Sequence, residues 1–260
     1  MKNIRDAQKI VIKIGTSTLA YKTGMINIRS IEKLVRVIAD LKNSGKEIII
    51  VSSGAIGVGM GKLRLKERPK DTPTKQALAA VGQCELMYIY DKLFSSYNHV
   101  VSQVLLTKDV IDMPTRKENV TNTFLRLLEM GSIPVVNEND TVAVEEIEFG
   151  DNDTLSAIVA ALVHADLLVI LSDIDGLYTA NPSEDENATL IDKVEKIDSY
   201  IESIAGNSNS GLGTGGMCTK IEAAKIATSH NVDMAILNGD DADNLYRLLD
   251  GEKIGTYFYS

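Results

Sequence analysis

The feature that most constrains the fold is an alternation between short apolar runs and longer stretches with helical periodicity. Lys9–Ile14, Glu47–Ser53 and Leu167–Leu171 consist mainly of Ile, Val and Leu, which is typical of strands buried on both faces. Between the first two runs, apolar residues recur every three or four positions over 28–41, which predicts a helix ending near Ser44-Gly45. This alternation predicts an α/β fold with a mostly parallel sheet and helices on both faces.

Weaker patterns complete the predicted order of elements. Further strands are predicted at 100–106, 133–136 and 232–238, extended pieces at 189–197, an extended or hairpin segment at 141–150, and an edge strand at 254–259. Further helices are predicted at 72–97, 116–130, 155–163 and 217–228. Since no linker or repeat divides the sequence, we predict a single domain over 1–260. The content of Gly, Pro, Asn and Ser predicts the greatest mobility at 61–75, 181–188 and 205–213.

Charge and hydropathy exclude several classes of protein. The chain has 27 basic and 36 acidic side chains and a net charge of −9, which argues against nucleic acid or an anionic membrane as a general partner. There is no signal-peptide pattern and no apolar run of about 20 residues. Cys84 and Cys218 lie far apart and fit a reducing compartment, so we expect a cytoplasmic protein. The basic segment 61–75 is best explained as a solvated loop, with anion steering or an oligomer contact as alternatives.

The segment 211–220, GLGTGGMCTK, has the composition of a loop that binds phosphate. Glycines let backbone N–H groups approach an anion closely, and Lys220 adds a positive charge at the start of a helix. A Walker A loop is excluded, because no Gly-Lys is followed by Ser or Thr. The glycines also fit G-x-G-x-x-G, but the preceding residues 206–210 are polar, whereas a dinucleotide fold needs a buried strand there. A different kind of nucleotide-phosphate loop is therefore predicted.

Small, polar or glycine-rich residues follow four of the predicted strands. Ligands of open α/β sheets bind beyond the carboxyl ends of the strands, so these junctions predict a binding crevice. The four junctions are Gly15-Thr16-Ser17, Ser52-Ser53-Gly54-Ala55, Asn137-Glu138-Asn139-Asp140 and Ser172-Asp173-Ile174-Asp175-Gly176.

Lys13 is the first charged candidate, because it interrupts an apolar strand. It either reaches solvent from the strand end or is buried beside a charged partner, and the strand alone favours neither. Lys220 favours the second interpretation, since two lysines can flank a phosphoryl group during transfer. Two such lysines need a carboxylate between them, for which Asp153 is the candidate. The alternative for Asp153 is a helix cap, the role that we favour for Asp151.

Further polar groups suit an amino acid. The backbone N–H groups of Ser53, Gly54 and Ala55 could bind a carboxylate at a helix N-terminus. Asn137, Asp140 and Asn152 offer oxygen acceptors for an ammonium group. Together they describe a site for a zwitterion of amino-acid size.

Taken in order, these motifs resemble the amino acid kinases along nearly the whole chain. The resemblance rests on 11–17 (VIKIGTS), 51–56 (VSSGAI), 75–83 (KQALAAVGQ), 137–140 (NEND), 149–153 (FGDND), 171–178 (LSDIDGLY) and 213–217 (GTGGM). The Ser-Ser-Gly-Ala and Phe-Gly-Asp-Asn-Asp pieces favour the branch that acts on glutamate over branches that act on N-acetylglutamate, aspartate, carbamate or uridylate.

The resemblance implies a three-layer αβα sandwich and transfer of the ATP γ-phosphate to the side-chain carboxylate of L-glutamate, yielding an acyl phosphate for proline synthesis. The implied catalytic residues are Lys13, Asp153 and Lys220. The implied substrate contacts are Ser53, Asp140 and Asn152, with Gly54, Ala55 and Asn137 nearby. The implied ATP site comprises Lys13, Gly15, Ser172, Asp173, Gly213, Thr214, Gly215, Gly216, Met217, Cys218, Thr219 and Lys220.

The resemblance also implies Mg²⁺ held mainly by the nucleotide phosphates, with no metal site made by the protein. It implies a homo-oligomer, a dimer or tetramer, with proline as a feedback inhibitor. Two departures are the end of the sequence at Ser260, before the C-terminal domain that many members carry, and Cys218, where Ser is usual. We expect a form without that domain and little effect of Cys218.

Three other interpretations compete with this one. The first keeps the fold but changes the acceptor to N-acetylglutamate, aspartate or another acid. The second is a non-catalytic nucleotide-binding regulator, which would not need the three charged residues Lys13, Asp153 and Lys220. A dinucleotide-dependent oxidoreductase ranks third.

Overall fold

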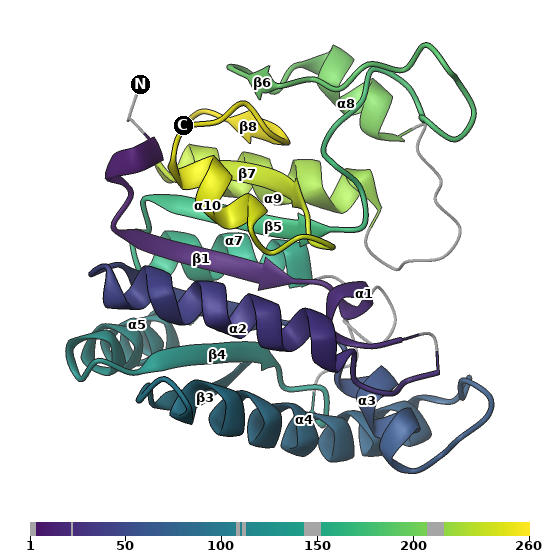
Figure 1. The fold of residues 1–260 in the computed structure, drawn as a ribbon, viewed down its shortest axis with the longest axis vertical. Coiled ribbons are helices and arrows are strands. Elements are labelled where there is room, and N and C mark those ends of the chain that lie inside the picture. Colours follow the sequence, from purple (N-terminus) through teal and green to yellow (C-terminus); the bar gives the residue numbers. More distant parts are fainter. Residues whose placement is uncertain (1–3, 22, 108–109, 111–112, 143–151, 207–215) are drawn as a thin grey trace.

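The computed structural model describes residues 4–21, 23–107, 110, 113–142, 152–206 and 216–260 (Figure 1). In chain order its elements are η1 (Ile4–Asp6), β1 (Lys9–Ile14), α1 (Thr16–Leu19), α2 (Ile28–Asn43), β2 (Glu47–Ser52), α3 (Ala55–Lys62), α4 (Thr72–Ser95), β3 (Val101–Leu106), α5 (Pro114–Glu129), β4 (Ile133–Glu138), α7 (Asn152–Leu162), β5 (Leu167–Ser172), β6 (Lys193–Val194), α8 (Ser199–Gly206), α9 (Met217–Ser229), β7 (Asp233–Asn238), α10 (Asn244–Leu249) and β8 (Thr256–Phe258).

The strands form one eight-stranded sheet in the order β3-β4-β2-β1-β5-β7-β8-β6. All neighbouring pairs are parallel except β7 and β8, which are antiparallel. β1 lies between β2 and β5, with Lys13 in register with Val51 and Ile170. The predicted α/β class and mostly parallel sheet are therefore confirmed.

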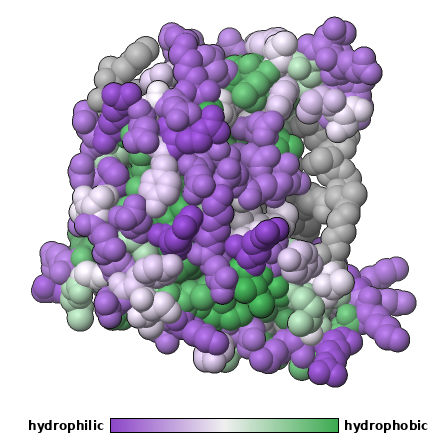
Figure 2. Space-filling model, viewed as in Figure 1, coloured by the Kyte–Doolittle hydropathy of each residue, from purple (hydrophilic) through white to green (hydrophobic). Residues whose placement is uncertain are grey.

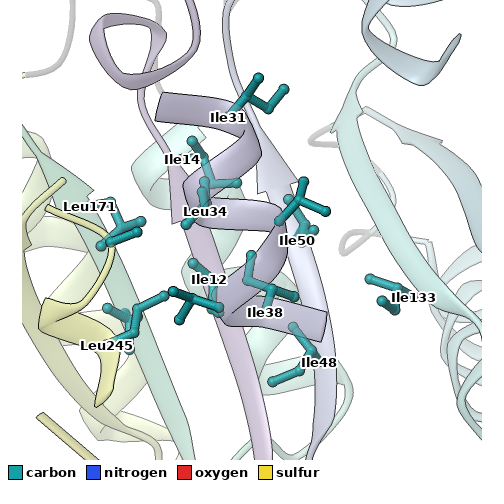
Figure 3. Close-up of a cluster of buried hydrophobic side chains, with 14 of the residues drawn as sticks. Ile12, Ile14, Ile31, Leu34, Ile38, Ile48, Ile50, Ile133, Leu171 and Leu245 are labelled. Atoms are coloured by element: carbon teal, nitrogen blue, oxygen red, sulfur yellow. The ribbon is translucent and has the colours of Figure 1, made fainter. Parts of the chain in front are cut away.

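Helices cover both faces of the sheet, as an αβα sandwich requires (Figure 1). Strand side chains alternate between the faces, so Ile12 and Ile14 of β1 pack with Leu34 and Ile38 of α2 in one core (Figure 3). Helices α4 and α10 contribute to this same core. The opposite face of the sheet packs against α5, α7 and α9 in a second core, to which Val11 belongs. Lys13, two residues after Val11, points to this second face.

Several element boundaries differ from the prediction. β4 continues through Asn137 and Glu138 rather than ending at Val136, because these two residues pair with Leu105 and Leu106 of β3. The strand at the C-terminus, β8, is not at an edge of the sheet, because β6 pairs with it on its outer side. The short helices α1, α8 and α10 were not predicted, and α8 includes Gly206, which the prediction assigned to a loop. The predicted hairpin at 141–150 and mobile segment at 205–213 lie largely outside the described residues.

Close packing of α3 on α4 positions the segment that precedes α3. A Cβ on Gly82 of α4 would overlap the carbonyl oxygen of Ala55, and a Cβ on Gly59 of α3 would overlap that of Leu78. Glycine at both positions lets the two backbones touch, although glycine lowers helix propensity. None of the described helices combines the length and apolar character needed to cross a membrane.

Candidate functional site

Two lysines from distant parts of the sequence contact one buried carboxylate at the carboxyl end of β1. Lys13 Nζ lies 2.7 Å from Asp153 Oδ1, and Lys220 Nζ lies 3.1 Å from Asp153 Oδ2. The side chain of Asp153 is 1% exposed, and those of Lys13 and Lys220 are 11% and 6% exposed. Thr219 Oγ1 also donates a hydrogen bond to Asp153 Oδ2, at 2.8 Å. We call Lys13, Asp153 and Lys220 the charged triad.

The electrostatics of the triad keep Asp153 ionised. Burial by itself acts to raise the pKa of this carboxyl group, but the charges of Lys13 and Lys220 and the hydrogen bonds from Lys13 and Thr219 lower the pKa to about 2. The single negative charge of this buried carboxylate offsets only one of the two positive charges of the ammonium groups beside it. The triad therefore has one net positive charge, which suits binding of a phosphate group.

Two helix N-termini add to this positive potential. Asp153 belongs to the first turn of α7, and Lys220 to the first turn of α9, which starts at Met217. The first N–H groups of a helix have no partner within the helix and carry a partial positive charge. Gly216, which precedes α9, makes no side-chain cap. The start of α9 therefore offers backbone donors to an anion beside Lys220.

A cluster of polar side chains lies directly beside the triad. Asn152, which precedes Asp153, donates from Nδ2 to Ser53 Oγ at 3.0 Å, to Asn137 Oδ1 at 2.9 Å and to the Ser52 carbonyl at 3.2 Å. Asn137 in turn donates from Nδ2 to Gln83 Oε1 at 3.0 Å. We call Gln83, Asn137 and Asn152 the amide chain. All three side chains are buried.

The turn between β2 and α3 completes this part of the site. Gly54 has a φ of 96°, in the left-handed region where glycine is favoured, and α3 starts at the next residue, Ala55. The N–H of Ser53 donates to the carbonyl of Ile14 at 3.1 Å, which joins this turn to the end of β1. Contrary to the prediction, this N–H is therefore already bonded within the protein and is not the one that would bind a carboxylate. The first N–H groups of α3, which have no partner within the helix, can donate hydrogen bonds to a carboxylate there.

Asp140 is a second buried carboxyl group, two residues beyond β4. Burial, and then the nearby charge of Glu138, raise the pKa of Asp140 to about 6. Both side chains are almost inaccessible, with Glu138 2% and Asp140 7% exposed. A carboxyl group in such a setting gains from a cation placed beside it.

The predicted nucleotide residues are described in part. Gly15 lies in the turn between β1 and α1, and Ser172, the last residue of β5, donates from Oγ to Asp173 Oδ1 at 3.2 Å. In α9, Met217 is buried and Cys218 is exposed. Gly213, Thr214 and Gly215 lie outside the described residues, as does Asp151. The structure thus brings the triad together with Thr219, and Ser53 together with Asn137 and Asn152.

Sequence reasoning missed Gln83 and the buried contact between Tyr90 Oη and Ser52 Oγ, at 3.0 Å. A signal was present for Gln83: it falls on the same helical stripe as Ala79, Leu86 and Tyr90, which are buried in α4. A polar residue on a buried stripe needs a polar partner, and the sequence does not say which one.

A separate groove lies elsewhere on the molecule, between two helices. It has a volume of about 710 Å³, runs between α2 and α4, and is lined by Ile28, Val35, Leu93 and Tyr97 together with charged residues of α2. The face in Figure 2 is mostly hydrophilic, with a larger hydrophobic area in the part where α2 and α4 lie. No residue of the triad or of the amide chain lines this groove. In the described part of the chain, no group of three or more His, Cys, Asp or Glu side chains is placed to hold a metal ion.

Comparison with known proteins identifies the relatives of this chain. The model of the amino acid kinase family matches residues 8–238. A glutamate 5-kinase of Clostridium perfringens is 54% identical over 261 residues, which cover 99% of this chain and 97% of that protein. A glutamate 5-kinase of Listeria monocytogenes is 54% identical over 263 residues, covering 100% of this chain and 95% of that protein.

Solved structures share the fold at low sequence identity. The UMP kinase of Bacillus anthracis has a TM-score of 0.65 and 17% identity, with coverage of 97% of this chain and 96% of that one. The carbamate kinase of Giardia lamblia has a TM-score of 0.67 and 13% identity, with coverage of 98% and 99%. The chain described here belongs to the amino acid kinase family.

Proposed function

We propose that this chain transfers the γ-phosphoryl group of ATP to the side-chain carboxylate of L-glutamate. The relatives named glutamate 5-kinase support this choice of acceptor. The observation that carries the proposal is the contact of Lys13 and Lys220 with Asp153, directly beside Asn152 and the amide chain. A cationic site for a phosphoryl group and a polar site for an amino acid thus meet at the first turn of α7.

In the proposed step, an oxygen of the glutamate side-chain carboxylate attacks the γ-phosphorus of ATP. An O–P bond forms, the bond from the γ-phosphorus to the oxygen shared with the β-phosphate breaks, and that oxygen leaves with ADP. The product is the acyl phosphate L-glutamyl 5-phosphate, the first intermediate of proline biosynthesis. Because the attacking carboxylate is already ionised, the protein has to supply alignment and charge neutralisation rather than a general base.

The residues divide into three groups in this proposal. Lys13 and Lys220 bind the transferring phosphoryl group, and Asp153 holds both lysines in position. The turn at Ser53, Gly54 and Ala55 binds the substrate α-carboxylate, while Asn137, Asp140 and Asn152 bind its ammonium group. ATP is bound by Lys13, Gly15, Ser172, Asp173 and the segment 213–220.

Mg²⁺ fits this site through the nucleotide. The described residues offer no cluster of three metal-binding side chains, so phosphate oxygens would provide most of the coordination. When bound together with the nucleotide, Mg²⁺ would supply further neutralisation of charge on the phosphates. We also infer that the protein is cytoplasmic, that it forms a homo-oligomer, a dimer or tetramer, and that proline inhibits it. Light scattering measures the oligomeric state, and assays with added proline measure the inhibition.

The direct test traps the product. The protein is incubated with Mg-ATP and one acid at a time from a panel of L-glutamate, N-acetyl-L-glutamate and L-aspartate, and hydroxylamine converts any acyl phosphate to a hydroxamate. We expect hydroxamate with L-glutamate and little with the others, because N-acetylation removes the ammonium group and aspartate is shorter by one methylene. Hydroxamate from another acid alone would change the acceptor, and ATP binding without any product would favour a nucleotide-binding regulator.

A further inference from the structure

The amide chain has a direction, because every amide has one donor end and one acceptor end. Asn152 Nδ2 donates to Asn137 Oδ1, and Asn137 Nδ2 donates to Gln83 Oε1. At the start of the chain, Asn152 Nδ2 also donates to the Ser52 carbonyl, which can only accept. The Ser52 carbonyl therefore requires this orientation of Asn152. Asn137 must then present its oxygen to Asn152, and Gln83 must present its oxygen to Asn137.

One acceptor of the amide chain receives no hydrogen bond from the described residues. Asn152 Oδ1 is buried, and no residue in the described part of the protein donates a hydrogen bond to it. A buried carbonyl oxygen without a donor costs about 1–3 kcal/mol, so such atoms in folded proteins call for an explanation. This oxygen belongs to the residue beside Asp153, next to the place where the phosphoryl group is transferred in the proposed function. A donor supplied by the substrate would explain it.

We propose that Gln83 is a positioning residue that, through Asn137, holds Asn152 with its Oδ1 presented to the α-ammonium group of the substrate. Gln83 touches neither substrate nor nucleotide in this scheme. Its acceptor oxygen satisfies Asn137 Nδ2 and so holds the Asn137 oxygen toward Asn152. Without that acceptor, Asn137 can rotate and offer its donor end to Asn152, which then loses one of the partners that fix its own orientation. The inference rests on the proposed function and extends it to the recognition of the amino group.

The packing of α3 on α4 explains how a residue in the middle of α4 can take this role. Gly82, the neighbour of Gln83, contacts the carbonyl of Ala55 at the start of α3. The turn that contains Ser53 and the helix that carries Gln83 are therefore held together by backbone contact. The position of the amide chain relative to that turn is set by the same contact.

The test compares glutamate with glutarate, which is the same diacid without the amino group. In Gln83→Met, which keeps the length of the side chain but removes the acceptor, we expect kcat/KM for glutamate to fall about tenfold, as for loss of a hydrogen bond to a charged group. The value for glutarate, measured as a substrate or as a competitive inhibitor, should change less than about twofold. The preference for glutamate over glutarate thus falls, whereas a purely structural defect would lower both values in parallel.

Three variants serve as controls. Gln83→Glu keeps an acceptor toward Asn137 and should restore most of the preference. Gln76→Met makes the same change on α4 at an exposed hydrogen bond, in which Gln76 Nε2 donates to the Thr141 carbonyl at 3.5 Å, and should leave the preference intact. In an Asn152→Ala background the preference is already reduced, and Gln83→Met should not reduce it further, because both changes act on one contact.

The outcomes distinguish failure of the proposed function from failure of the role assigned to Gln83. If the wild-type protein forms no hydroxamate from glutamate, the proposed function fails. If it does, but Gln83→Met lowers glutamate and glutarate equally, or still acts in the Asn152→Ala background, only the role of Gln83 fails. Thermal melting shows whether Gln83→Met folds; if it does not, Gln83→Leu replaces it and is compared with Gln83→Glu in the same way.

Discussion

Lys13 and Lys220 bind opposite oxygens of one carboxylate, that of Asp153, at 2.7 and 3.1 Å. One lysine comes from the first strand and the other from the helix that follows the glycine-rich segment. Buried like charges at this spacing repel each other unless an opposite charge separates them. The carboxylate therefore positions two cations around a single anion site.

We expect Asp153→Asn to abolish turnover while the protein still folds. The amide cannot hold two ammonium groups, so both lysines lose their alignment toward the phosphoryl group, and kcat should fall at least about 100-fold. Stability should also fall, by about 3 kcal/mol, because two buried charges lose their partner. The two effects are measured by steady-state kinetics well below the melting temperature and by thermal melting. Loss of activity only in proportion to the unfolded fraction would make Asp153 a structural cap instead.

Lysines on one helix should differ sharply in their effect on catalysis. Lys220→Met removes a cation from the triad, and we expect kcat to fall by about 100-fold. Lys225→Met, one turn further along α9, removes a lysine that contacts Glu202 and Glu222 at the surface, at 2.8 and 2.7 Å, and should change kcat less than about twofold. Kinetics of both variants at saturating ATP make the comparison. Similar losses in both would show that the net charge of α9, rather than the triad, is what matters.

The pH dependence of glutamate use should report Asp140. Its carboxyl group has a pKa of about 6 in the folded protein, raised by burial and by Glu138. Since an ammonium group binds the ionised form, kcat/KM for glutamate should fall about tenfold per unit as the pH decreases below about 6. Asp140→Asn should remove this inflection and lower kcat/KM at higher pH. A profile that keeps the inflection in Asp140→Asn assigns it to another group.

The raised pKa of Asp140 also affects the stability of the folded protein. Because the folded-state pKa of Asp140 lies above its ordinary value of 3.8, the folded protein binds the proton more tightly than the unfolded chain. This group therefore favours folding at low pH, and its contribution is lost as the pH rises through about 6. Asp140→Asn should accordingly raise the melting temperature of the ligand-free protein at neutral pH. Bound glutamate should reduce the difference between the two proteins.

Because the backbones of α3 and α4 are in contact, adding one methyl group at Gly82 should lower both stability and glutamate binding. In Gly82→Ala the new Cβ overlaps the Ala55 carbonyl, so α3 must shift, and we expect a loss of about 2 kcal/mol in the free energy of unfolding. Because the turn at Ser53 and Gly54 leads into α3, KM for glutamate should rise as well. In Gly206→Ala, at the end of α8, the new Cβ meets no atom of the described residues within 4 Å, and stability should change by less than about 1 kcal/mol. Denaturant unfolding and glutamate titrations measure both variants.

Much of the fold followed from local patterns in the sequence. The runs at Lys9–Ile14 and Leu167–Leu171 predict strands because a sheet covered on both faces needs apolar side chains at nearly every position. The position of β8 did not follow, because its neighbours are chosen by long-range pairing, and β6 is too short to carry a pattern. The continuation of β4 through Asn137 likewise depends on pairing with β3, since Asn and Glu have low strand propensity.

The sequence by itself determined the class of fold and the types of group at the ends of the strands, because hydrophobic periodicity and residue chemistry are local properties. Only the tertiary structure decided which of these groups meet. Gln83 sits on a helical stripe that could have faced any polar partner, and the hydrogen bond to Asn137 exists because glycines let α4 approach α3. The direction of the amide chain is likewise set by the Ser52 carbonyl. Every residue has a backbone carbonyl, and the tertiary structure decides that this one lies beside Asn152.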